Sequence, residues 1–99
     1  KMLSLKDEYL TEIRALLNQY VPRMEVWAYG SRVKNKSHDG SDLDLVIRNP
    51  NQLDQPLANL SQLRSALSES NIPIQVEIVD WATIPTSFQT EIINQHISI

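Results

Sequence analysis

Apolar residues recur at helical spacing in three stretches of the chain and alternate with polar residues in three shorter ones. Helical spacing predicts a first helix that ends at Pro22, a second from about 54–56 to about 69, and a last one after Pro85. Alternation predicts strands over 25–29, 42–48 and 72–81, the last opened by Pro73, and residues 31–36 should form one or two helical turns. The apolar positions expected to face inward from the helices are Leu3, Leu10, Ile13, Leu16, Leu17, Tyr20, Leu57, Leu60, Leu63, Leu67, Phe88, Ile92 and Ile93.

This order of elements predicts an α/β (α+β) fold, in which a mixed sheet of three or four strands has helices on one side and an open face on the other. A length of 99 residues with 41% hydrophobic content suffices for one modest core, so residues 1–99 are expected to form a single domain. The apolar end, Ile97-Ser98-Ile99, could dock on this domain, contact a partner, or mark a truncated chain.

Two carboxylates stand two residues apart at the start of the second predicted strand. Asp42 and Asp44 therefore leave the same face of the sheet. Neighbouring carboxylates repel each other unless a cation lies between them. Mg²⁺ takes oxygen ligands and is usually held by one or two carboxylates together with the phosphates of a substrate. The pair thus indicates a magnesium site, although a turn with two solvated acids would give the same pattern.

A Gly30-Ser31 turn follows the first predicted strand and precedes the acid pair by a short loop. Glycine allows the backbone to approach an anion closely, and a helix that starts at Ser31 would point free N–H groups at a phosphate. Arg32, Lys34 and Lys36 come next and are three of the nine basic residues in the chain. The combination of turn, basic loop and acid pair fits a polyphosphate substrate, which neither the turn nor the pair would indicate alone.

Composition excludes several other classes of protein. A net charge of −3 and a pI near 5.2 argue against direct nucleic-acid binding, which calls for a basic face. The absence of cysteine excludes disulfides, thiolate metal sites and a thiol nucleophile. No apolar run approaches the roughly 20 residues that span a bilayer, and no signal-peptide core opens the chain, so a cytoplasmic location without membrane contact is expected. His38 and His96 are interpreted as a solvated loop histidine and a helix-face histidine.

The segments Gly30-Ser31-Arg32 and Ser41-Asp42-Leu43-Asp44-Leu45 resemble the signature of the DNA polymerase beta-like nucleotidyltransferases. The short chain around them resembles the minimal nucleotidyltransferase (MNT) branch of that superfamily. One difference is Asn35, where glycine is usual; asparagine tolerates left-handed backbone well, so the loop should keep its shape. The resemblance implies a nucleotidyltransferase fold that binds ATP or another nucleoside triphosphate with two Mg²⁺ ions. It implies nucleotide-binding roles for Gly30, Ser31, Arg32, Lys34 and Ser41.

The family uses three carboxylates for metal binding and catalysis, and the resemblance implies that Asp42, Asp44 and Glu77 fill these positions. Glu77 lies in the third predicted strand on the face opposite Val76 and Ile78. Asp80 is the competing acid, but it is three residues from Glu77 and so cannot share its face on a regular strand. We interpret Asp80 as a residue that ends the strand or caps a helix. A glutamate at this position, where aspartate is more usual, could weaken catalysis.

The reaction that the resemblance implies is transfer of a nucleoside monophosphate, AMP from ATP, to a hydroxyl acceptor. Larger relatives carry a further domain for the acceptor, and its absence here favours a partner protein in that role. In the minimal branch this partner is a toxin of the all-helical HEPN class, modified on a tyrosine, so the chain would act as an antitoxin. Two alternatives stay open: a non-catalytic module that binds nucleotide or partner, and an aminoglycoside-type small-molecule transferase whose cleft a homo-oligomer would supply.

Overall fold

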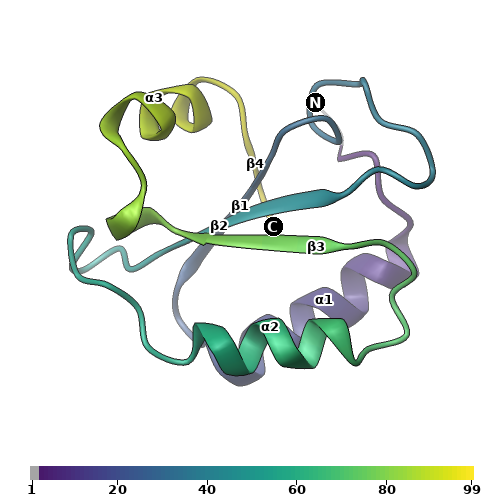
Figure 1. The fold of residues 1–99 in the computed structure, drawn as a ribbon, viewed down its shortest axis with the longest axis horizontal. Coiled ribbons are helices and arrows are strands. Elements are labelled where there is room, and N and C mark those ends of the chain that lie inside the picture. Colours follow the sequence, from purple (N-terminus) through teal and green to yellow (C-terminus); the bar gives the residue numbers. More distant parts are fainter. Residues whose placement is uncertain (1–2) are drawn as a thin grey trace.

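The computed structural model describes residues 3–99 and shows four strands and three α-helices (Figure 1). The elements are α1 (Asp7–Tyr20), β1 (Glu25–Tyr29), β2 (Leu43–Arg48), α2 (Leu60–Ser68), β3 (Val76–Asp80), the 3₁₀ helix η1 (Trp81–Thr83), α3 (Thr86–Asn94) and β4 (Ile97–Ser98). None of the helices in this part of the chain combines the length and the apolar character needed to cross a membrane.

The strands form one mixed sheet with the order β3-β2-β1-β4. β1 pairs antiparallel with both β2 and β4, whereas β2 and β3 run parallel and α2 provides the crossover between them. This confirms the predicted α/β architecture with a mixed sheet. The apolar C-terminal residues, whose role the sequence left open, dock on the domain as β4: Ala28 pairs with Ile97, and the Ile99 N–H donates to the Val26 carbonyl over 3.0 Å.

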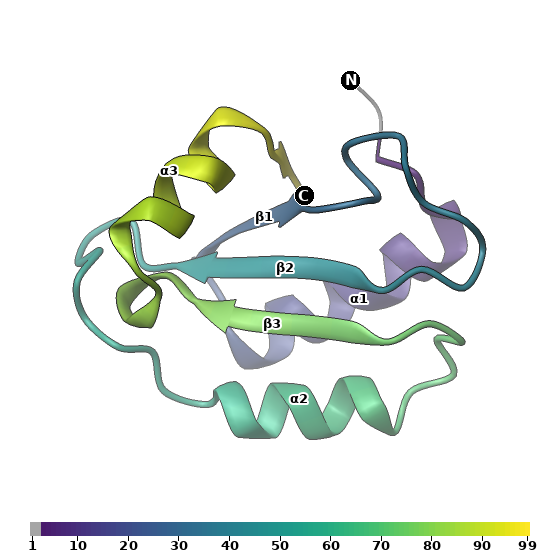
Figure 2. The ribbon, with the colours of Figure 1, turned by 45° about the horizontal axis from the view of Figure 1, so that its top comes forward.

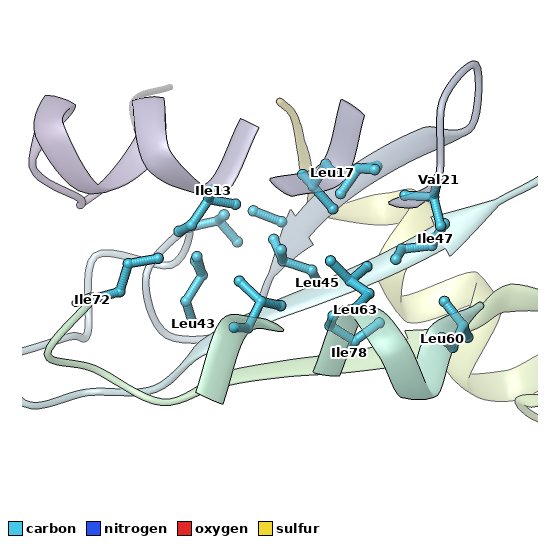
Figure 3. Close-up of a cluster of buried hydrophobic side chains, with 14 residues drawn as sticks. Ile13, Leu17, Val21, Leu43, Leu45, Ile47, Leu60, Leu63, Ile72 and Ile78 are labelled. Atoms are coloured by element: carbon cyan, nitrogen blue, oxygen red, sulfur yellow. The ribbon is translucent and has the colours of Figure 1, made fainter. Parts of the chain in front are cut away.

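The main core lies between the sheet and the layer formed by α1 and α2 (Figure 3). Alternation along β2 sends Leu43, Leu45 and Ile47 into this core, and each of them is fully buried. Ile13 of α1 and Leu63 of α2 meet them from the helical layer, also without solvent exposure. The helical and strand periodicities read from the sequence therefore meet in one cluster, as expected.

Among the described residues, the helices that cover the opposite face of the sheet are η1 and α3, at one end (Figure 2). Trp81 and Ile92 pack there on Val46 of β2 in a second buried cluster. The Arg48 guanidinium contacts two indole rings, 4.0 Å from the centroid of Trp27 and 4.3 Å from that of Trp81. Helices on one side of the sheet were expected, and α3 adds this partial second layer, which leaves the part of the face around Asp44 uncovered by a helix.

Two predicted element starts and the orientation of one residue are wrong. α2 begins at Leu60 and not near Pro56, because Asn59 has a left-handed backbone (φ 68°) that cannot continue into a helix. The Leu57 N–H, moreover, donates to the Asp80 carboxylate over 2.9 Å and not to a helical carbonyl. β3 begins at Val76, three residues after Pro73. On α3, Ile93 does not face inward but is 52% exposed.

Candidate active site

A row of three side chains crosses the face of the sheet opposite α1 and α2, and the ring of Tyr29, at one end of this row, packs edge-on against Phe88 of α3. Tyr29, the last residue of β1, pairs with Asp44 of β2, and Asp44 pairs in turn with Glu77 of β3. Residues that pair directly across a sheet point to the same face with Cβ atoms roughly 4.5–5.5 Å apart. Asp42 stands two residues before Asp44, just ahead of the strand, and is exposed. The sheet thus brings the three predicted carboxylates to one patch, and sequence reasoning missed that Tyr29 joins them.

Gly30 makes the turn that directly follows Tyr29 at the end of β1. Its φ of +82° is a conformation that favours glycine, and its carbonyl accepts hydrogen bonds from the N–H groups of Val33 and Lys34, each over 3.1 Å. A Cβ on Gly30 would lie 2.5 Å from Oδ2 of Asp44. The backbone of the turn therefore approaches one metal-ready carboxylate more closely than any other residue type would allow.

The residues after this turn form the compact loop that the sequence predicted in outline. Ser31 accepts at its carbonyl from the N–H groups of Lys34 and Lys36, over 3.2 and 3.1 Å, so the segment makes turns without a regular helix. Asn35 has a left-handed backbone with φ 62°, which confirms that asparagine takes over the conformation for which glycine is usual. Lys34 and Lys36 are exposed and free to meet a ligand's charge.

The Arg32 guanidinium, to which the resemblance gives a nucleotide-binding role, is surrounded by backbone carbonyls. The residue is buried, with 6% exposure, and its nitrogens donate to backbone carbonyls. Nε and Nη2 both reach the Ser41 carbonyl, over 3.1 and 2.9 Å, and Nη1 reaches that of Ser4 over 2.6 Å. Nη2 also reaches the carbonyls of His38 and Asp39. Arg32 thus ties the loop that leads into Asp42 to the Gly-Ser turn. This structural role follows from the carbonyls that its nitrogens contact, and the sequence motif alone does not indicate it.

Ser41 has a second loop contact. Its hydroxyl accepts the His38 N–H over 2.9 Å, and the ring Nδ1 of His38 accepts the Gly40 N–H over 3.2 Å. His38 is exposed, in agreement with the interpretation as a loop histidine. These contacts close the turn over 38–41 directly ahead of Asp42. The loop is therefore shaped by its own hydrogen bonds and by Arg32.

The electrostatics of the row fit a divalent cation. Burial, and then the charges of Asp42 and Glu77, raise the pKa of the Asp44 carboxyl above its ordinary value. Burial, together with the charges of Asp44 and Glu77, raises the pKa of Tyr29 to about 12. The neighbouring carboxylates thus make the Asp44 carboxyl harder to ionise, and a bound cation would offset that repulsion. The oxygen-only donor set is the one that Mg²⁺ prefers.

The third carboxylate has a hydrogen-bond partner outside the row. Glu77 is exposed, and its Oε1 accepts a hydrogen bond from the side-chain amide of Gln75, which shares its face of β3. Across residues 3–99, no three acidic or histidine side chains already converge as a metal cluster. The three carboxylates therefore share one face of the sheet without forming a ready-made metal site in the described part of the chain.

Two residues set aside by sequence reasoning have structural roles. Asp80 is buried, and its carboxylate accepts from the N–H of Ala82, which caps η1, and from that of Leu57. This confirms its interpretation as a capping residue at the end of the strand. His96 does not lie on a helix face but follows α3, where its ring stacks on Trp27 with centroids 3.9 Å apart.

Comparison with known proteins is consistent with this site. The family described as polymerase beta nucleotidyltransferase matches residues 11–99. The probable protein adenylyltransferase MntA of Haemophilus influenzae is 43% identical over 87 residues, which cover 88% of this chain and 75% of that protein. A crystal structure of a toxin–antitoxin with AMP-PNP has a TM-score of 0.71 at 22% identity, covering 89% of this chain and 69% of that one.

A mutant MntA–HpeT toxin–antitoxin structure has a TM-score of 0.72 at 21% identity and covers 96% of this chain and 72% of the other. At these identities the two structures establish the shared fold. The family generally uses a divalent metal ion, in line with the acidic row described above. The sequence resemblance, the mixed sheet and the family match agree, and the chain belongs to the polymerase beta nucleotidyltransferase family.

Proposed function

We propose that residues 1–99 act as one nucleotidyltransferase domain that transfers AMP from ATP to a tyrosine hydroxyl of a HEPN-type toxin and so acts as an antitoxin. The row of Tyr29, Asp44 and Glu77, with Asp42 beside it, is the structural observation that carries the proposal. The identity of 43% to a probable protein adenylyltransferase supports a protein acceptor. Because ATP is the donor, the reaction is proposed to take place in the cytoplasm.

In this proposal Asp42 and Asp44 hold Mg²⁺, and Glu77 completes the set when its side chain leaves Gln75; two ions are expected. Bound there, Mg²⁺ offsets charge on the attacking and leaving oxygens. The backbone of Gly30 and Ser31 binds the β- and γ-phosphates, and Lys34 supplies a positive charge at the loop surface. Ser41 and Arg32 hold the loop that carries Asp42.

The transfer itself forms a bond between the acceptor oxygen and the α-phosphorus of ATP. The bond from that phosphorus to the bridging oxygen breaks, and pyrophosphate leaves with the electron pair. Glu77 stands at the acceptor side of the row and accepts the hydroxyl proton, a role that needs hydrogen-bond reach to the acceptor. The raised pKa of Tyr29 keeps its own hydroxyl protonated, so it can donate a hydrogen bond beside Asp44 but does not compete as a nucleophile.

Incubation of the protein with labelled ATP, Mg²⁺ and the purified toxin tests this function. Label should appear on the toxin with the wild type and disappear with Asp42→Ala. Asp39→Ala is the matched control, because Asp39 is an exposed acid of the same loop that lies outside the row, and it should transfer normally. Equal labelling by wild type and Asp42→Ala, or no label in either, would contradict the proposal.

The contact between Gln75 and Glu77 favours one alternative, an antitoxin that binds ATP or toxin without chemistry. That function needs the fold but not the metal pair. Asp44→Ala would then still neutralise the toxin in a growth assay, whereas the transferase proposal predicts that neutralisation is lost.

A further inference from the structure

β3 is an outer strand of the sheet, with β2 on one side and no strand on the other within residues 3–99 (Figure 2). The Leu43 N–H donates to the Gln75 carbonyl over 2.9 Å, which fixes the phase of the parallel ladder. In such a ladder alternate residues aim both backbone groups at the same neighbour. Glu77 and Val79 therefore aim theirs at β2, and Val76 and Ile78 aim theirs at the free edge.

One hydrogen bond confirms this phase from the other side. Nη2 of Arg64, on α2, donates to the Ile78 carbonyl over 3.0 Å, so that carbonyl points away from β2. No partner is found in residues 3–99 for the N–H and carbonyl of Val76 or the N–H of Ile78. The edge thus presents two free donors, the N–H groups of Val76 and Ile78, and one free acceptor, the Val76 carbonyl. The next outward carbonyl, that of Ile78, is already occupied by Arg64.

A groove of about 510 Å³ runs along this edge. Its walls are α2, at Arg64, Leu67 and Ser68, the segment 72–75, and β3 itself. Glu77 also lines the groove, between Val76 and Ile78, and its side chain lies on the face of the sheet that carries Asp44. We call the space the edge groove. Its lining includes the unpaired backbone groups of β3 and Glu77, the outermost residue of the row.

We propose that an extended segment of the acceptor protein binds in the edge groove as an added strand beside β3. This inference rests on the proposed function, since it supplies the acceptor that the function requires. Backbone groups spaced like those of a strand are satisfied by another polypeptide backbone, which is how strand addition to an open edge works. A small-molecule acceptor would leave them unpaired.

Register gives the added strand a further property. The residue that pairs with Glu77 has its side chain on the same face as Glu77, Asp44 and Tyr29. A hydroxyl-bearing side chain at that position continues the row of Tyr29, Asp44 and Glu77 beyond Glu77, so its hydroxyl lies next to the Glu77 carboxylate. The edge groove thus selects the acceptor by its backbone shape, and the row selects the position within it that is modified.

Amide hydrogen exchange tests this in the full-length protein, with the purified HEPN-class toxin as the probe. In the free protein the amides of Val76 and Ile78 should exchange fast, and those of Glu77 and Val79 slowly. In the complex Val76 and Ile78 should become protected by at least about tenfold, because their N–H groups acquire partners. Unchanged exchange at both residues, in a complex that still transfers AMP, would overturn the inference and leave the proposed function standing.

A substitution provides the second test. Val76→Pro removes one outward N–H but no bond to β2, and proline is tolerated at such edge positions. It should raise the KM for the toxin by roughly two- to tenfold, the effect of one lost hydrogen bond, while kcat and Mg²⁺–ATP binding stay unchanged. Val76→Ala is the control, since it removes more of the side chain but keeps the N–H. An equal effect of both variants on KM would overturn the inference.

Discussion

Gly30→Ala probes the closest contact in the site. Alanine at a φ of +82° costs about 1–2 kcal/mol of backbone strain. The new Cβ would also lie 2.5 Å from Oδ2 of Asp44, so the carboxylate or the strand must shift. Overpacking of this kind typically costs a further 1–3 kcal/mol, roughly, which brings the expected loss in the free energy of unfolding to about 2–5 kcal/mol.

The loss should be visible in both stability and binding. For a domain of this size about 1 kcal/mol corresponds to a shift in Tm of roughly 4–8 °C, so Gly30→Ala should lower Tm by at least about 8 °C. Isothermal titration should show weaker Mg²⁺–ATP binding, because Asp44 no longer occupies its place. Gly40→Ala is the matched control: its Cβ would meet only the His38 ring, at 3.6 Å, and should change neither quantity.

A double-mutant cycle separates strain from contact. With Asp44→Ala as background, the carboxylate that the new Cβ meets is gone, and Gly30→Ala should then cost only the backbone part of its penalty, about 1–2 kcal/mol. The reasoning is refuted if Gly30→Ala is as stable as Gly40→Ala, or if its penalty is the same with and without the Asp44 carboxylate.

Three further changes have expected outcomes. Arg32→Lys should lower the free energy of unfolding by about 2–4 kcal/mol in chemical denaturation, because lysine cannot reproduce the charge-assisted bonds of the guanidinium fork to the loop carbonyls, and wild-type stability would contradict this role. Asp44→Asn should be more stable than the wild type at neutral pH, by less than about 1 kcal/mol, but should not bind Mg²⁺. The sign follows from the raised pKa of Asp44: the folded protein binds this proton more readily, so wild-type stability gains from Asp44 as the pH falls through the raised pKa, and this gain should be missing from a pH series on Asp44→Asn. Arg48→Met should lower Tm through the loss of two cation–π contacts, about 1–2 kcal/mol together, and an unchanged Tm would show that the indoles pack equally well on an apolar chain.

The parts of the site that sequence reasoning located are those governed by strand parity and local backbone geometry. Parity put Asp44 on the face opposite Leu43 and Leu45, and it separated Glu77 from Asp80. Asn35 could be assigned a left-handed conformation because few residue types adopt it. These inferences depend on neighbours along the chain, which the sequence displays directly.

The parts that it missed depend on contacts between distant segments. The motif implies that Arg32 binds the nucleotide, whereas in the fold its guanidinium is surrounded by the carbonyls of Ser4 and of the loop 38–41. Asp80, far away in the sequence, accepts the Leu57 N–H and so holds the segment ahead of α2 against the end of β3. The apolar C-terminus carried no signal that it would pair with β1. Such contacts become visible only when the sheet is assembled.

The acidic row spans three strands drawn from both halves of the chain, so no local segment contains the site. A ligand that binds the row binds the assembled sheet and not the unfolded chain, and its binding free energy adds to the stability of the whole sheet. Occupancy by nucleotide and metal would then set how long the protein survives cellular proteases, because degradation draws on the unfolded population. The lifetime of the protein would thereby increase with the concentration of its own substrate.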